Sequence, residues 1–185
     1  MKRIILTVAA VFAFGFANAQ DKSASSDAIK FGVKGGVQFT NFAGDDADGL
    51  DGKTGFYIGG LADFTVSEKF HVQPELLFST EGAEEDGFDL GLSYLRLPIM
   101  AKYYVMEGLN IQAGPEVAFK VAAAEDLFDD STKSVDFGLG FGAGYEMASG
   151  LMFDARYNLG LSNIADYEDG DLKNTGFQVG LGYRF

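Results

Sequence analysis

The chain has 185 residues, a formal net charge of −13 and no cysteine. This length suits one domain, and the missing thiols exclude both a disulfide and a thiolate metal site. The negative balance argues against nucleic acid as a partner, because phosphates attract lysine and arginine. With 25 glycines and 18 phenylalanines, the composition is unusual for a soluble globular protein and suits a small β-barrel.

The first segment has the three parts of a secretory signal peptide. Lys2 and Arg3 precede an apolar run over residues 4–16, and Ala17-Asn18-Ala19 supplies small residues for cleavage. The apolar run is too short to cross a membrane as a helix. We therefore expect a signal peptide over 1–19, a polar periplasmic leader over 20–29 and a barrel domain over 30–185.

Eight later segments alternate apolar and polar residues with a period of two, as β-strands do. In the first of them Phe31, Val33 and Val37 point to one side, whereas Lys34 and Gln38 point to the other. No charged residue falls on the apolar face of any segment. The expected strands cover residues 30–41, 54–65, 69–80, 92–105, 109–122, 135–148, 151–163 and 175–185.

The connections between these strands alternate between short and long. Residues 66–68, 106–108 and 149–150 form short turns, and the long, acidic connections cover 42–53, 81–91, 123–134 and 164–174. This pattern is typical of outer-membrane barrels, with both termini in the periplasm and the long loops outside the cell. Pro74, Pro98 and Pro115 fall within strands, where a missing N–H predicts β-bulges.

Alternation alone is also compatible with a soluble, lipocalin-like barrel whose apolar face points inward. The interior of an eight-stranded barrel is just wide enough to be filled by side chains. It could not hold this many large apolar residues, whereas the opposite, glycine-rich face suits a narrow lumen. The sequence therefore predicts an all-β protein, an eight-stranded antiparallel up-and-down transmembrane β-barrel with its apolar face toward lipid.

The last strand, 175–185, is about the length that a tilted strand needs to cross a bilayer. It ends on an aromatic residue, with Tyr183 and Phe185 on its apolar face. This ending resembles the terminal strand of bacterial outer-membrane barrels, in which the final Phe is read by the insertion machinery. The resemblance implies that Tyr183 and Phe185 form an insertion signal and that the barrel-assembly machinery is a partner.

The inward faces of the strands carry charges of both signs in balance. Because buried charges must be paired, this balance predicts a plugged lumen held by ion pairs, with a charged, selective pore as the alternative. Glu75 is expected to pair with Arg96 or Arg156. The predicted lumen charges are Lys34, Asp63, Glu75, Arg96, Lys102, Glu116, Lys120, Asp136, Glu146, Asp154, Arg156 and Arg184.

The long connections hold most of the remaining acids. Among them, Asp46, Asp48 and Asp51 resemble part of a calcium-binding loop, with carboxylates at alternate positions. The twelfth position from Asp46 is Tyr57, where the EF-hand pattern needs a bidentate Glu. We expect a solvated acidic loop and no cofactor, with a divalent cation at the loops as the alternative. The acids counted in these loops include Asp45, Glu81, Glu84, Glu85, Asp86, Asp89, Glu125, Asp126, Asp129, Asp130, Asp166, Glu168, Asp169 and Asp171.

Segments 55–64, 70–79, 94–99 and 155–161 resemble the PorT-like outer-membrane β-barrel family of Bacteroidota. This resemblance covers the chain after the signal peptide and implies an integral outer-membrane protein of a Gram-negative bacterium. Glu75 and Arg156 match recurrent positions of the family. The association of the family's namesake with protein secretion implies a secretion role as one alternative.

The candidate chemistry of an enzyme is weak in this sequence. The single histidine, His71, is expected near the periplasmic end, and Ser79 lies at the opposite end of the same strand, so no nucleophile–base pair forms. We expect a non-enzymatic, monomeric protein with a structural or surface-interaction role through its acidic loops. Its expected partners are outer-membrane lipid, lipopolysaccharide and envelope or secretion proteins. The alternative is a narrow pore or an accessory component of transport or secretion.

Overall fold

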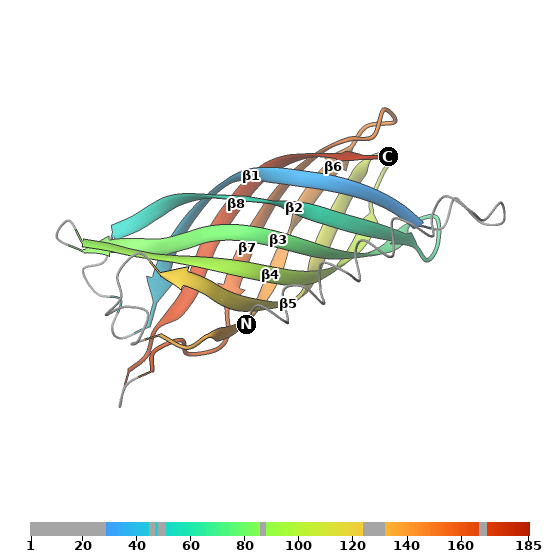
Figure 1. Ribbon diagram of the computed structural model, residues 1–185. Coiled ribbons are helices and arrows are strands. Elements are labelled where there is room, and N and C mark those ends of the chain that lie inside the picture. Colours follow the sequence, from blue (N-terminus) through green and yellow to red (C-terminus); the bar gives the residue numbers. More distant parts are fainter. Residues whose placement is uncertain (1–28, 45–46, 48–50, 86–87, 124–131, 167–169) are drawn as a thin grey trace.

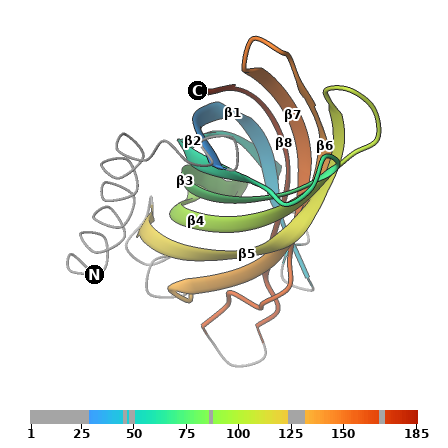
Figure 2. The same ribbon diagram turned by 90° about the vertical axis from the view of Figure 1, so that its right-hand side faces the viewer.

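The computed structural model describes residues 29–44, 47, 51–85, 88–123, 132–166 and 170–185. Eight antiparallel strands follow one another around a closed barrel, and β8 pairs with β1 to complete it (Figures 1 and 2). The predicted eight-stranded up-and-down barrel is thus confirmed. The strands are β1 (Ile29–Ala43), β2 (Asp51–Thr65), β3 (Phe70–Glu85), β4 (Phe88–Tyr104), β5 (Leu109–Ala123), β6 (Val135–Glu146), β7 (Leu151–Gly160) and β8 (Lys173–Arg184).

Three tight turns lie at one end of the barrel, on the right in Figure 1, where β8 also ends. We call this the turn end, and the opposite one the loop end. Backbone hydrogen bonds close each turn, for example from Val66 N to Phe70 O at 3.0 Å and from Met147 N to Leu151 O at 2.8 Å. The second and third turns each need a residue in the left-handed conformation, which Gly108 (φ 76°) and Gly150 (φ 91°) supply.

The two faces of each strand separate as the alternation predicts. Outward residues are apolar and exposed, such as Phe39, Ile58 and Phe177, whereas inward ones such as Gln38 and Arg156 are buried. Along β1, Phe31 and Phe39 are about 20 Å apart along the barrel axis, for a strand tilted by about 40°. That distance is close to the height of the apolar band of a membrane barrel. No helix among the described residues is long and apolar enough to span a membrane.

The connection predicted over 81–91 is largely strand, which corrects the sequence interpretation. β3 and β4 stay paired from Phe70–Tyr103 to Glu85–Phe88, so they form a tall hairpin at the loop end. Inward positions on this extension, such as Glu81 and Ala83, are buried as they are lower in the barrel. The sequence over 81–91 lacks the apolar alternation of the lower strands, because it is rich in acids and glycine, and this hides the strand from a hydrophobic pattern.

The prediction of bulges at the three prolines is wrong. The β3–β4 ladder keeps one register past Pro74, and the β5–β6 ladder keeps one register past Pro115. The register shifts lie elsewhere, between Gly52 and Tyr57 in β2–β3 and at Ser93 in β4–β5. A proline loses one ladder hydrogen bond, worth about 1 kcal/mol, and the bonds on either side suffice to hold the register.

Smaller differences occur at the strand ends. β6 and β7 are shorter than predicted, ending at Glu146 and Gly160, and the turn between them covers 147–150. Ile29, predicted to close the leader, already belongs to β1 and pairs with Phe64. The remaining signal peptide and leader lie outside the described residues.

Candidate functional site in the barrel interior

The middle of the barrel holds four charged residues, Lys34, Glu75, Asp154 and Arg156, which we call the central cluster. Arg156 donates from Nη1 to Glu75 Oε2 at 2.9 Å and from Nη2 to Glu75 Oε1 at 2.8 Å. Lys34 Nζ lies 2.7 Å from Asp154 Oδ1 and 3.5 Å from Glu75 Oε1. These side chains come from β1, β3 and β7, so the cluster ties distant walls of the barrel together. A bidentate, fully buried pair of this kind is geometrically specific.

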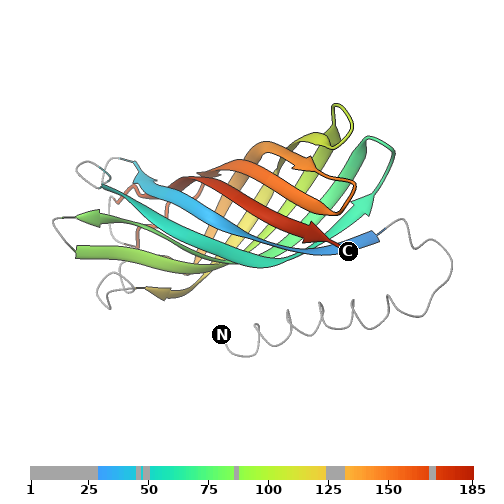
Figure 3. The ribbon, with the colours of Figure 1, turned by 90° about the horizontal axis from the view of Figure 1, so that it is seen from above.

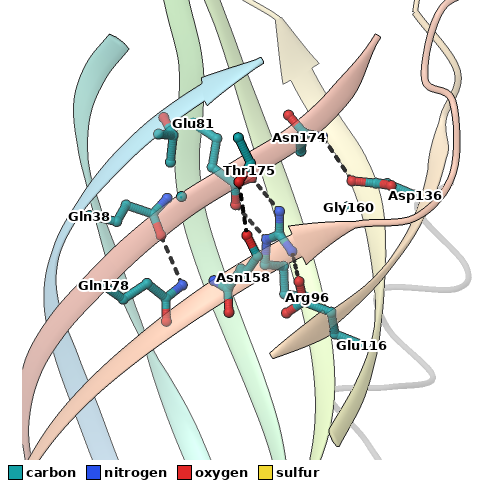
Figure 4. Close-up of a pocket in the computed structure, with 12 residues that line it drawn as sticks. Gln38, Glu81, Arg96, Glu116, Asp136, Asn158, Gly160, Asn174, Thr175 and Gln178 are labelled. Atoms are coloured by element: carbon teal, nitrogen blue, oxygen red, sulfur yellow. Dashed lines mark hydrogen bonds and ion pairs between the residues drawn. The ribbon is translucent and has the colours of Figure 1, made fainter. Parts of the chain in front are cut away.

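Closer to the loop end, Arg96 lies between two carboxylates, Glu81 and Glu116, and these three form the outer cluster (Figure 4). Arg96 Nη1 donates to Glu116 Oε1 at 2.6 Å, and its Nε and Nη2 donate to the two oxygens of Glu81. All three residues are buried. The planar guanidinium can bind both carboxylates because its donors point in several directions.

Two further predicted charges near this level have polar partners. Lys120 Nζ donates to Thr132 O at 2.7 Å and to Thr132 Oγ1 at 2.9 Å. Asp136 accepts from Ser162 Oγ at 2.6 Å and from Asn174 Nδ2 at 2.8 Å. Lys120 and Asp136 therefore tie Thr132 and Ser162 to the inner side of the barrel wall.

At the turn end, Asp63, Lys102, Glu146 and Arg184 form the turn-end cluster. Lys102 Nζ donates to Asp63 Oδ2 at 3.1 Å and also to Glu146 Oε1. Arg184 Nη1 lies 2.6 Å from Glu146 Oε2 and 3.8 Å from Asp63 Oδ2. Arg184 stands on β8 and Asp63 on β2, so these contacts reach across β1, where the barrel closes. In Figure 3 the end of β8 lies beside the start of β1.

Eleven of the twelve predicted lumen charges lie in the barrel interior, where they are hydrogen-bonded to one another or to polar neighbours. The twelfth, Arg184, lies at the rim and forms ion pairs there. Of the two bases predicted opposite Glu75, Arg156 is the partner, and Arg96 binds Glu81 and Glu116 instead. Glu81 itself was predicted in a loop and is a buried lumen residue. The period of two, continued from Glu75 through Leu77 and Ser79, could have identified it.

Above the outer cluster, apolar side chains close the loop end. Phe42, Leu92 and Tyr94 are buried there against Ile164 and Leu172, which come from the segment between β7 and β8. Backbone bonds hold this segment down, from Lys133 N to Ile164 O and from Ile164 N to Leu172 O, each at 2.7 Å. In the part of the loop end that the structure describes, apolar packing thus covers the barrel above the outer cluster.

The space that remains inside is small. The cavity beside the outer cluster measures about 10 Å³, and one between the central and turn-end clusters measures about 20 Å³. A single water needs about 10–15 Å³ on this measure. The polar layers, together with buried Leu61, Leu77 and Met100, therefore fill the lumen.

The other sequence candidates are placed apart from one another. His71 Nδ1 lies 2.5 Å from Asp63 Oδ1 in the turn-end cluster, whereas Ser79 donates to Glu81 at 2.6 Å in the outer one. Asp51 is exposed at the start of β2, and its predicted calcium-loop partners Asp46 and Asp48 lie outside the described residues. Within the described ranges, no group of three or more His, Cys, Asp or Glu residues is arranged to hold a metal ion.

Tyr183 and Phe185 lie outward at the turn end, with ring centroids 5.8 Å apart. The backbone N of Phe185 donates to Phe31 O at 2.8 Å, which adds a bond to the β8–β1 seam. Their predicted part in insertion stays a prediction.

A sequence profile described as outer membrane protein beta-barrel domain matches residues 6–185. The chain belongs to this outer-membrane barrel family. The exposed apolar faces of its strands are therefore its lipid-facing surface, in the outer membrane of a Gram-negative bacterium. No curated protein sequence matches the chain.

Solved structures agree on the fold. Neisserial surface protein A is similar with a TM-score of 0.59 and 10% identity, over 84% of this chain and 97% of that one. Ail, the attachment invasion locus protein of Yersinia pestis, gives a TM-score of 0.51 and 16% identity, over 84% and 98% of the two chains. Ail in complex with the heparin analogue sucrose octasulfate gives 0.52 and 17%, over 85% and 99%. At these identities the likeness concerns the fold alone.

The absence of a side chain at Gly180 leaves space in the lumen for the Tyr57 side chain. A Cβ added there would lie 2.0 Å from the Tyr57 hydroxyl oxygen, which is held at 3.4 Å from Asp154 Oδ2. Because Tyr57 is fully buried and cannot swing away, Gly180→Ala should destabilise the barrel by about 1–3 kcal/mol in urea unfolding.

A matched control is Gly60→Ala, where the nearest atom to an added Cβ is Gly32 O at 3.7 Å, an ordinary contact. In a Tyr57→Leu background, the alanine at 180 should cost less than it does in the native chain. Strictly additive effects of the two substitutions would contradict this account.

Proposed function

We propose that this protein is a closed, non-conducting outer-membrane barrel that acts at the cell surface through its long connections. The observation that carries the proposal is the filled interior, in which the two cavities beside the ion-pair clusters measure about 10 and 20 Å³. A barrel built for passage needs a continuous polar path, whereas here buried ion pairs and the apolar cover cross the bore at several levels.

The proposed orientation has both termini and the tight turns in the periplasm and the loop end outside. Short periplasmic turns and longer outer connections are the usual arrangement of this architecture. The acidic character of those connections favours cationic partners. Divalent cations bridging to lipopolysaccharide phosphates fit this charge, since hard oxygen ligands suit Ca²⁺ and Mg²⁺. A sulfated sugar such as the one in the Ail complex would be repelled, because the net charge here is −13.

The resemblance of segments 55–64, 70–79, 94–99 and 155–161 supports placing the chain among the PorT-like barrels of Bacteroidota. We propose a monomer without enzymatic activity that is inserted by the barrel-assembly machinery. The alternative is a narrow pore or an accessory component of transport or protein secretion.

Single cysteines can test the orientation, because the native chain has none. Asp166→Cys places a thiol at an exposed position of the loop end, and Glu107→Cys places one in an exposed turn. On intact cells, a membrane-impermeant maleimide should label the thiol at 166 and leave the one at 107 unlabelled. Both should react after the outer membrane is permeabilised. Labelling of the turn variant alone on intact cells would reverse the proposed topology.

Planar-bilayer recordings test the closed lumen. The purified, folded protein should show no steady conductance, because moving an ion past the central cluster requires separating buried charges. The two interior cavities beside the clusters, of about 10 and 20 Å³, each have room for about one water. A reproducible, ion-selective current would overturn the closed-barrel proposal and favour the pore.

A further inference from the structure

Asn110 is a fully buried polar residue that belongs to none of the three ion-pair clusters. It stands on β5 opposite Gly144 of β6, and it is 0% exposed. Among the described residues, neither its Nδ2 nor its Oδ1 has a hydrogen-bond partner. A buried amide in this position costs free energy at both ends unless something pairs with it. Native interiors rarely tolerate this, so the residue points to a bound species.

The space in front of this amide is a built site. Asn110 lines the cavity of about 20 Å³, together with Gln112, Met152 and Leu61. Gly144, the neighbour of Asn110 on the adjacent strand, leaves room for the amide, since a Cβ there would lie 3.2 Å from both amide atoms of Asn110. The cavity volume suits one water, or at most two.

The chemistry of the cavity selects the ligand. A metal cation would satisfy only the amide oxygen, and an anion would satisfy only the NH₂ group, whereas water donates and accepts. The charged residues that line the cavity are two bases and two acids, Lys34, Lys102, Glu146 and Asp154. They leave no surplus charge for an ion to balance. The cavity is also too small for an organic solute.

We propose that this cavity is a binding site for one ordered water, held by both ends of the Asn110 amide. The water lies between the central cluster, through Lys34 and Asp154, and the turn-end cluster, through Lys102 and Glu146. It therefore joins the two ion-pair clusters into one hydrogen-bonded unit, because a bridging water is nearly as favourable as a direct hydrogen bond. This site places an ordered water in the half of the lumen nearest the turn end, below the central Glu75–Arg156 pair.

A crystal structure of the full-length protein at a resolution that shows ordered waters tests the site directly. The expected result is a density peak within hydrogen-bonding distance of both Asn110 Nδ2 and Oδ1. An empty cavity, or an Asn110 amide bonded directly to a neighbouring side chain, would overturn the proposal.

The sign of a stability change gives an independent test. If the amide is satisfied by water, Asn110→Leu removes those bonds and should shift the urea midpoint of unfolding downward. If the cavity is dry, the same substitution removes an unsatisfied amide and fills space, so the midpoint should rise, and the proposal fails. Met152→Leu, at another position lining the cavity, changes shape without changing polar groups and should leave the density peak in place.

Discussion

Replacing Glu75 by alanine is expected to lower the free energy of unfolding by about 3–5 kcal/mol. The carboxylate is buried, accepts both hydrogen bonds of the Arg156 fork and accepts a third from Gln73 at 2.7 Å. Without it, the Arg156 guanidinium loses its carboxylate while staying buried, and Lys34 keeps only the second of its two ion pairs, with Asp154. A buried charge that loses its partner is costly because water cannot reach it.

The measurement is urea unfolding in lipid vesicles, followed by the heat-modifiable migration of the folded barrel on gels. Lys173→Ala is a control, since Lys173 pairs with Asp171 at 2.8 Å but has a side chain that is 37% exposed. Its loss should cost no more than about 1 kcal/mol, as exposed ion pairs do. Equal costs for the two substitutions would show that burial does not control the value of the central pair.

Removing both members of the pair provides a second comparison. Glu75→Leu combined with Arg156→Met replaces the ion pair by apolar groups of similar size. This double variant should be more stable than Glu75→Ala, because no unpaired charge remains in the lumen. The difference in unfolding free energy between Glu75→Ala and the double variant separates the cost of an unpaired Arg156 guanidinium from the contribution of the ion pair itself.

Arg96→Met should be at least as damaging, at about 3–5 kcal/mol or more. Arg96 is the base of the outer cluster, and it binds Glu81 and Glu116 at once. Its removal leaves two buried carboxylates that repel each other with no base between them. The expected loss of stability therefore includes both desolvation and repulsion.

Two changes should restore part of this loss. Glu81→Gln and Glu116→Gln, added to Arg96→Met, remove the stranded charges and should recover stability. Lowering the pH should also stabilise Arg96→Met relative to the native chain, because a proton on either carboxyl relieves the repulsion. If acidification weakened both proteins to the same extent, Arg96 would not be the group that compensates these acids.

Much of this fold can be predicted from the sequence, because a membrane barrel imposes a strict rule on each strand. Outward positions meet lipid and inward ones meet a narrow lumen, so the period of two in segments such as 30–41 carries both strand and face. The lumen charges follow from the same register. Lys34 and Arg156, for example, are inward by counting alone, and both are buried.

The prediction weakened where the lipid ends. β3 and β4 continue beyond the apolar band, and there neither face has to be apolar, so the extension looked like a loop. Glu81 was counted among the loop acids for this reason, although it binds Arg96 in the lumen. The prolines misled for a different reason. Each proline removes one hydrogen bond, but the hydrogen bonds on either side of it hold the strand register. The register is therefore unchanged at Pro74 and Pro115.

The sequence by itself determined the strand order, the lipid-facing side and the set of charges that must be neutralised inside. Only the tertiary structure decided which charges meet. Arg156 of β7 reaches Glu75 of β3 across the lumen, and this pairing depends on the tilt and offset of strands that are not adjacent in sequence. Arg96 of β4 instead binds Glu81 and Glu116 on the two neighbouring strands, β3 and β5. Alternation specifies the direction of a side chain but not its height in the barrel. Height follows from the closure of β8 on β1, which is a property of the whole ring.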